Sequence, residues 1–166
     1  MIRKCRANDA RRMYLIINEA ARAYDGVIPA DCYHQPYMLM EELEEEMKRV
    51  TFYVWEESGE LIGIMGVEPI EDVTLIRHSY VLPRWQGKGI GSRLLNHIKE
   101  LVTTSRLLVG TWADARRAIA FYQKYGFRRL LGKDELLQKY WDIPWRQIEA
   151  SVVLGLHIEK GIKESP

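Results

Sequence analysis

Three glycines stand at alternate positions just ahead of a leucine-rich, helix-like run. The stretch RWQGKGIGSRLL, residues 84–95, contains Gly87, Gly89 and Gly91. A glycine inside a helix costs about 0.5–1 kcal/mol relative to alanine, so three of them together indicate a need for bare backbone. Amide N–H groups at the start of a helix point toward one spot and carry about half a positive charge, which suits a bound phosphate. The stretch therefore predicts an anion site that fits a pyrophosphate.

The spacing of these glycines excludes two other glycine-rich phosphate sites. A P-loop requires Gly-Lys followed by Ser or Thr, but Lys88 is followed by Gly89. A dinucleotide-binding turn requires G-x-G-x-x-G, whereas the spacing here is G-x-G-x-G. The remaining alternative, a plain flexible turn, would need only one glycine.

The residues on either side of the glycines predict a strand, a turn and a helix. The segment VTLIRHSYVLP, residues 73–83, has the composition of a strand and ends at a proline. After the turn, apolar residues recur at helical spacing. A further strand is expected over 106–112, followed by a helix over 113–127 with Asp114 as its N-cap and Gly126 as its C-terminal stop.

The rest of the chain completes one α/β domain. The sequence predicts, in order, a strand over 2–6, a helix from Asn8 or Asp9 to about Ala23, an aromatic loop over 24–36, a helix over 37–49, a hairpin over 51–70, a strand over 127–131, a short helical piece over 134–140 and a strand over 148–156. The full order is β-α-α-β-β-β-α-β-α-β-β, a mixed and mostly antiparallel central sheet flanked by helices. Residues 1–158 are expected to form this single domain, and residues 159–166 a polar C-terminal tail.

Composition limits the class of protein. The chain has 166 residues, enough for one domain with a sizeable core, and its two cysteines, Cys5 and Cys32, do not suggest a disulfide framework. No run approaches the roughly 20 apolar residues of a membrane span, and the N-terminus lacks the apolar stretch of a signal peptide. A cytoplasmic protein without a membrane partner is expected. The four histidines are scattered without metal-ligand spacing, so no metal is expected.

Charge is segregated along the chain. Residues 41–72 hold eleven acidic residues against two basic ones, and residues 84–129 hold ten basic against two acidic. Solvated faces of helices and strands explain most of these charges. The separation also suggests a polyanionic ligand on one side of the protein and a cationic one on the other. Nucleic acid is not expected as a partner, because no aromatic stacking motif accompanies the basic stretch.

The motif Gln86-Gly87-Lys88-Gly89-Ile90-Gly91 resembles the Q/R-x-x-G-x-G/A signature of the GNAT superfamily of acyl-CoA-dependent N-acetyltransferases. The segment AIAFYQKYGF, residues 118–127, resembles the second motif of that family, and the order of elements is similar over nearly the whole chain. The resemblance implies that acetyl-CoA is the co-substrate. It implies that the main chain of Ser79, Tyr80 and Val81 pairs with the pantetheine arm. It further implies a loop braced by Gln86 and a pyrophosphate held by the amides of Gly87, Lys88, Gly89, Ile90, Gly91 and Ser92.

The resemblance also assigns a role to Tyr122, which stands where the family places a tyrosine facing the thioester sulfur. Without the resemblance, Tyr122 would be interpreted as a core aromatic of its helix. A phenol of pKa about 10 is a weaker acid than a thiol of about 8.5, so full proton donation to the thiolate is uphill by roughly 2 kcal/mol. Hydrogen-bond stabilisation of the thiolate is the expected role.

The sequence offers two candidates for the general base and lacks the one that some family members carry. Some family members carry a glutamate near the end of the strand that corresponds to residues 106–112, but this chain has Gly110, Thr111 and Trp112 there. Many also carry an asparagine where this chain has Ala115. An amine must nevertheless lose a proton before it attacks, and Glu68 and His78 are the candidates, acting directly or through water. A structural role remains an alternative for both.

The acceptor is expected to contact the aromatic loop through Tyr24, Ile28 and Tyr33, which are alternatively hydrophobic anchors or a dimer contact. The predicted function is transfer of an acetyl group from acetyl-CoA to a primary amine of a small molecule or peptide, by direct attack through a tetrahedral intermediate. The alternative is a non-catalytic acyl-CoA-binding or regulatory module. A homodimer is left open.

Overall fold

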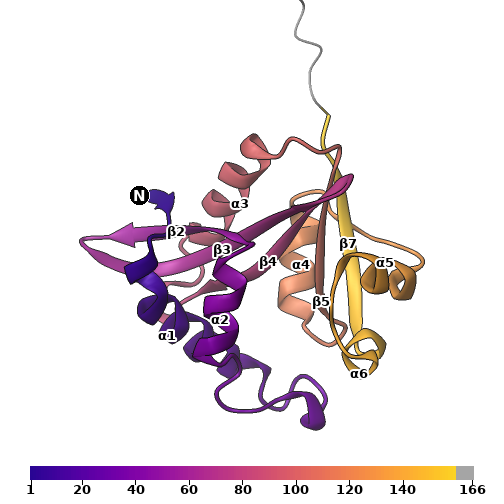
Figure 1. Cartoon of the computed structure of the whole chain (residues 1–166), viewed down its shortest axis with the longest axis horizontal. Helices are drawn as coiled ribbons and strands as arrows, with labels where there is room; N and C mark the ends of the chain where they lie inside the picture. The colour runs from indigo at the N-terminus through magenta and orange to yellow at the C-terminus, as the bar shows by residue number, and fades with distance from the viewer. Residues whose placement is uncertain (160–166) are drawn as a thin grey trace, which may run out of the picture.

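The computed structural model describes residues 1–159 and contains one seven-stranded sheet in the order β1-β2-β3-β4-β5-β7-β6 (Figure 1). Neighbouring strands are antiparallel except β4 and β5, which are parallel. The prediction of a mixed, mostly antiparallel sheet flanked by helices is confirmed. The strands are β1 (Ile2–Lys4), β2 (Thr51–Glu57), β3 (Glu60–Ile70), β4 (Val73–Val81), β5 (Arg106–Trp112), β6 (Arg128–Arg129) and β7 (Ser151–His157).

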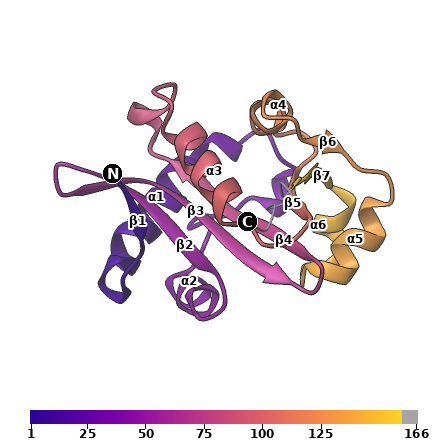
Figure 2. The ribbon, with the colours of Figure 1, turned by 90° about the horizontal axis from the view of Figure 1, so that it is seen from above.

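Helices cover both faces of the sheet because each presents an apolar stripe to it. The helices are α1 (Ala10–Ala21), α2 (Met40–Met47), α3 (Ile90–Leu101), α4 (Arg116–Lys124), α5 (Lys133–Tyr140) and α6 (Trp145–Glu149). Figure 1 shows α3 on one face of β2 to β4 and α1 and α2 on the opposite face. Seen from above, α5 and α6 lie beside β7 (Figure 2). No helix within residues 1–159 has the length and apolar character needed to cross a membrane.

The hydrophobic core is formed where these apolar stripes of the helices pack against the sheet. Met13, Ile16 and Ile17 of α1 and Leu94 and Leu95 of α3 are fully or almost fully buried. They belong to one large apolar cluster with the inward side chains of the sheet. A second cluster joins α5 and α6 to β4, β5 and β7. Strand β4, which leads into the glycine turn, therefore contributes residues to both clusters.

Most expected elements are present, with three corrections to the predicted helices and strands. The N-cap of α4 is Ala115, without a side-chain cap, so the prediction of Asp114 as N-cap was wrong, while Gly126 does follow the end of that helix with φ +93°. The strand expected from residue 148 begins at Ser151, because the preceding residues form α6, a helix that the sequence analysis missed. The first long helix ends at Ala21 and continues as a 3-10 turn, Arg22–Tyr24. The expected polar tail, apart from Glu159, lies outside the described residues.

Strands β4 and β5 diverge halfway along their length, and the candidate site described below lies at this divergence. They pair from Val73 opposite Arg106 to Ile76 opposite Val109, after which β5 continues beside β7 alone. The second half of β4 keeps only β3 as a neighbour. Its outer edge therefore presents main-chain groups that no strand of the described residues occupies.

A bulge accompanies the divergence. Tyr80 pairs with Ile64 and Arg77 with Gly66, so His78 and Ser79 together oppose the single residue between them on β3. His78 has φ +54°, a left-handed conformation that costs a residue with a Cβ about 1–2 kcal/mol. The bulge redirects the side chains at this point of the strand.

Candidate active site

A cleft of about 530 Å³ opens where β4 and β5 diverge. Its walls come from the ends of these strands, the segment between α1 and α2, α2 itself, α4, and the segment from α5 to α6. Elements from both halves of the chain therefore meet at one place. Tyr24, His78, Ser79, Tyr80 and Tyr122, all predicted from the sequence, line this cleft.

The glycine turn is built as its spacing suggests. Gly87 and Gly89 have φ +76° and +83°, and a Cβ atom added to either would meet nothing within 4 Å. Glycine is therefore required there by the backbone conformation and not by crowding. Gly89 is the left-handed N-cap of α3. Gly91 lies inside the helix, where an added Cβ would touch Phe121 at an ordinary 3.6 Å, so packing does not demand a glycine at that position.

The amides from Gly87 through Ser92 donate to no acceptor within residues 1–159. The first amide after this stretch that donates a hydrogen bond is that of Arg93, which donates to the carbonyl oxygen of Gly89 at 3.0 Å. Residues 86–89 are exposed, whereas Ile90 is buried and Gly91 and Ser92 are partly buried. Gln86 Nε2 donates to the carbonyl oxygen of Val81 at 3.0 Å and so ties the loop to the end of β4.

The basic side chains near the turn have protein partners. Lys88 Nζ lies 4.8 Å from the ring centroid of Trp85. Arg84 pairs with Glu60 at 3.1 Å and with Glu19 at 3.5 Å. The candidate anion site predicted from the sequence therefore consists of main-chain amides, with these basic side chains beside it.

The edge of β4 leads from the turn into the cleft. Ser79 and Tyr80 line the cleft, whereas Val81 lies beyond it toward the turn. Both Tyr80 and Val81 keep their pairing with β3, so the edge that faces away from β3 is the free one. An extended ligand can add to this edge as another strand would.

Tyr122 is a buried residue of α4 that reaches the cleft. Burial raises the pKa of Tyr122 to about 12, with hydrogen bonding to Ser79 acting weakly in the opposite direction. The phenol is therefore neutral and a hydrogen-bond donor at physiological pH. Phe121 and Phe127 pack against its ring with centroid distances of 5.1 and 5.2 Å.

An aromatic wall formed by Tyr24, Tyr37, Tyr80 and Trp112 faces the acceptor side of the cleft. The Tyr37 hydroxyl accepts a hydrogen bond from Trp112 Nε1 at 2.9 Å, and its ring lies 5.3 Å from that of Tyr24. Burial raises the pKa of all three tyrosines. The wall is therefore uncharged.

Two of the predicted acceptor residues do not line the cleft. Ile28 is buried in a small cluster with Trp112 and Ala115. Tyr33 stacks on Tyr37 at 6.4 Å and accepts a hydrogen bond from Gln35. Both support the wall from behind, which is the anchoring role that the sequence left open for them.

The two candidates for a base are placed differently. His78 lines the cleft, and its Nε2 lies 3.5 Å from Oε1 of Glu46, a residue of α2 that the sequence analysis did not single out. Glu68 is buried behind the cleft and pairs with Arg77 at 3.1 Å and Arg49 at 3.3 Å. Only His78 is therefore positioned to meet a reactant. The only signal for Glu46 was its membership of the acidic run from residue 41.

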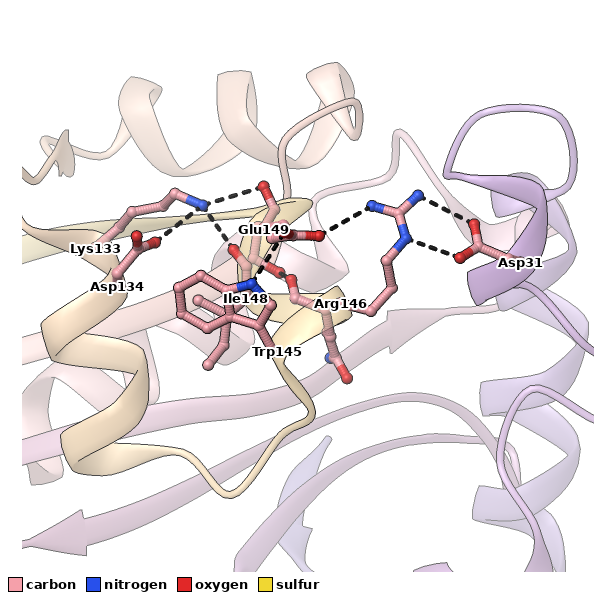
Figure 3. A network of polar contacts seen from close by, with 9 residues as sticks. Asp31, Lys133, Asp134, Trp145, Arg146, Ile148 and Glu149 are labelled. Carbon is pink, nitrogen blue, oxygen red and sulfur yellow. Dashed lines mark hydrogen bonds and ion pairs between the residues drawn. The ribbon is translucent and has the colours of Figure 1, made fainter.

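Charges at the mouth of the cleft are unevenly balanced. Asp31 makes a two-pronged contact with Arg146, at 2.7 and 3.0 Å, that joins the segment between α1 and α2 to α6 (Figure 3). Lys133 holds the end of the same helix by donating to the carbonyl oxygens of Ile148 and Glu149 (Figure 3). Glu42 and Asp142, in contrast, line the cleft with no ion pair within residues 1–159.

Comparison with known proteins identifies the class. Residues 48–129, which include the glycine turn and Tyr122, match the family described as an acetyltransferase (GNAT) domain. Over these residues the chain matches the acetyltransferase (GNAT) domain, and the resemblance noted in the sequence is confirmed.

Solved structures of similar shape are acetyltransferases. The ribosomal-protein-S18-alanine N-acetyltransferase from Escherichia coli is 16% identical, with a TM-score of 0.72 over 100% of this chain and 98% of that one. The PaiA N-acetyltransferase from Thermoplasma acidophilum, in complex with coenzyme A, is 16% identical, with a TM-score of 0.71 over 95% and 98% of the two chains. Ard1 from Thermoplasma volcanium is 17% identical, with a TM-score of 0.73 over 96% and 98%. At these low sequence identities, the TM-scores establish a shared fold.

Proposed function

We propose that this protein transfers an acetyl group from acetyl-CoA to a primary amine by direct attack, without a covalent enzyme intermediate. The observation that carries the proposal is the row of unpaired amides from Gly87 through Ser92 at the start of α3, joined by a free strand edge to a cleft. The match to the acetyltransferase (GNAT) domain and the coenzyme A complex of the PaiA relative support the same function.

The residues of the turn suit a pyrophosphate. Nothing lies within 4 Å of the positions that Cβ atoms would take at Gly87 and Gly89, so a diphosphate can approach the main chain. Each amide that donates to a phosphate oxygen contributes on the order of 1.5–3 kcal/mol. The pantetheine arm would then follow the edge of β4 past Tyr80 and Ser79. When bound, acetyl-CoA supplies the thioester carbonyl that the amine attacks.

Tyr122 is proposed to stabilise the departing thiolate. Because burial raises the pKa of Tyr122 to about 12, complete transfer of its proton to a thiolate would be uphill by about 5 kcal/mol. A hydrogen bond from the neutral hydroxyl needs no such transfer, and it strengthens as negative charge develops on sulfur.

His78 is proposed to accept the proton of the amine. An alkyl ammonium of pKa about 10.4 must spend about 4.6 kcal/mol to expose its lone pair at pH 7. His78 takes this proton and passes it to solvent, the C–N bond forms, and the C–S bond breaks. The proton that nitrogen loses after the attack ends on the coenzyme A thiolate, which balances the reaction.

The charges of the cleft favour a cationic acceptor. Its lining holds the carboxylates of Asp31, Glu42, Glu46 and Asp142 against the guanidinium groups of Arg77 and Arg146. Each arginine already has a carboxylate partner. Glu42 and Asp142 therefore remain to attract an ammonium group, and Tyr24 offers an aromatic face for the chain that carries it.

The test combines binding with turnover. Calorimetry with acetyl-CoA is expected to detect a single site, and thiol release is expected with alkyl diamines or peptides that have a free N-terminus. Acceptors with a carboxylate near the amine should react more slowly than matched cationic ones. Binding without turnover for any amine would favour the non-catalytic alternative. Absence of acetyl-CoA binding would refute the proposal.

A further inference from the structure

His78 and Glu46 meet across two elements that are distant in the sequence. Both side chains are mostly buried, with 17% and 14% of their surface exposed, and His78 Nε2 lies 3.5 Å from Glu46 Oε1. Nε2 of His78 and Oε2 of Glu46 are buried atoms without a hydrogen-bond partner in residues 1–159. Buried polar groups in this condition are uncommon, and a catalytic role is one of the explanations for such a group.

The geometry separates the two ring nitrogens of His78. Nε2 is buried and faces the carboxylate of Glu46. Nδ1 makes no hydrogen bond within residues 1–159 and is not among the buried atoms without a partner, so it is the more accessible nitrogen of a residue that lines the cleft. A carboxylate at one nitrogen favours the proton on that nitrogen and leaves a lone pair on the other. His78 is thereby prepared to accept a proton at Nδ1.

The backbone places the imidazole for this contact. His78 lies in the bulge of β4 with φ +54°, although glycine would adopt that conformation without strain. The imidazole stacks on Phe52 of β2 with a centroid distance of 6.0 Å. Strained residues of this kind persist where the surrounding structure holds them, and they concentrate at functional sites.

A network of charges keeps Glu46 ionised. Burial by itself would raise the pKa of Glu46, but His78, Arg77 and Arg49 outweigh burial and lower it. Arg49 and Arg77 both contact Oε1 of Glu46, at 3.1 and 3.2 Å, and both also contact Glu68. Glu68, one of the bases predicted from the sequence, thus balances the arginines that hold Glu46 in place.

We propose that Glu46 is the positioning residue of His78: it holds the Nε2–H tautomer, aims Nδ1 into the cleft and stabilises the imidazolium that forms during acetyl transfer. The inference rests on the proposed function for its kinetic part only. The charged groups around the imidazole are Glu46 and Glu42 of α2, Arg49 after that helix, Arg77 of β4 and, through the arginines, Glu68 of β3. Phe52 adds no charge.

The kinetic test compares Glu46→Gln with Glu45→Gln. Glu45 is exposed on the same helix and, within residues 1–159, pairs only with Lys48, so its substitution removes the same charge away from the cleft. Glu46→Gln is expected to lower kcat about 10- to 100-fold, less than the roughly 10²- to 10⁴-fold that a general base itself contributes, and to leave acetyl-CoA affinity unchanged. Glu45→Gln should resemble the parent protein in both measurements.

A double-mutant cycle with His78→Gln tests whether Glu46 acts through His78. The double variant should be no slower than His78→Gln alone, whereas independent roles would make the two losses multiply. Glu46→Asp, which keeps the charge but withdraws the carboxylate, should give an intermediate kcat. An unchanged kcat in Glu46→Gln, or multiplying losses in the cycle, would overturn the proposal.

A spectroscopic readout is independent of any activity. Nitrogen-15 spectra of the parent protein with labelled histidine should show His78 as the Nε2–H tautomer at a pH where it is neutral. In Glu46→Gln the two tautomers should be redistributed. If the parent shows the Nδ1–H tautomer, the proposal fails even if acetyl transfer is demonstrated. If no acetyl transfer is found but the Nε2–H tautomer is present, the proposed function fails and the pairing stands.

Discussion

The two sides of the cleft are built in different ways. The proposed donor side is main chain from one continuous stretch, the end of β4 and the turn into α3, with the glycines at 87 and 89 in left-handed conformations. The proposed acceptor side consists of side chains from α2, β4, α6 and the segment between α1 and α2. A site made of backbone tolerates side-chain changes but not loss of its conformation, whereas a site made of side chains responds to single substitutions. The predicted effects below separate these two behaviours.

The largest effect is expected from Tyr122→Phe, at the junction of the two sides. Removing one hydrogen-bond donor to a developing anion lowers kcat by about 100-fold or more, while acetyl-CoA affinity stays the same. Single-turnover kinetics and calorimetry measure these quantities. Tyr140→Phe is the matched control, because Tyr140 is also buried but donates to Asp72 outside the cleft. Equal losses in both variants would show that the effect is structural.

Gly89→Ala should weaken acetyl-CoA binding by about 10-fold, since a Cβ at positive φ costs about 1–2 kcal/mol and shifts the amides. Gly132→Ala is a close control: Gly132 is the left-handed N-cap of α5, and a Cβ there also meets nothing within 4 Å. That variant should lose comparable thermal stability and bind acetyl-CoA normally. Normal binding by Gly89→Ala would remove the basis for a backbone cradle.

Asp142→Asn should raise KM for a cationic acceptor by about 3-fold, the scale of a partly exposed charge contact, and leave acetyl-CoA affinity unchanged. The increase should shrink at high salt, because ions screen exposed charges. Asp25→Asn, an exposed position outside the cleft, is the control. An increase that persists for a neutral acceptor would contradict an electrostatic role.

The smallest effect is expected from Asp31→Asn, which breaks the contact with Arg146. Hydrogen bonding to Arg146 lowers the pKa of Asp31. The pair therefore stabilises the fold above the ordinary aspartate pKa of about 3.9 and loses this effect as the pH falls through the lowered value. Thermal melts of the variant and the parent should differ slightly at pH 7 and converge in acid. A difference that grows in acid would contradict this sign.

The donor side could be predicted from the sequence because its cause is local. Left-handed turns at Gly87 and Gly89, the helix that follows and the strand that precedes them are each encoded within a few residues. The strand and helix order was readable for the same reason, since it follows from apolar spacing within each element. Where local signals were weak, at Asp114 and at the short helix α6, the prediction failed.

The acceptor side was decided only by the tertiary structure. Glu46 is one of several similar acids on α2, and nothing in its neighbourhood along the chain distinguishes it. It acquires a role because the sheet brings β4 beneath that helix, so that His78 and Arg77 reach its carboxylate. Likewise, Ile28, Tyr33 and Glu68 have suitable chemistry but contact other residues and are not among those that line the cleft. Periodicity and backbone preference act between near neighbours, whereas the meeting of side chains depends on how distant segments pack.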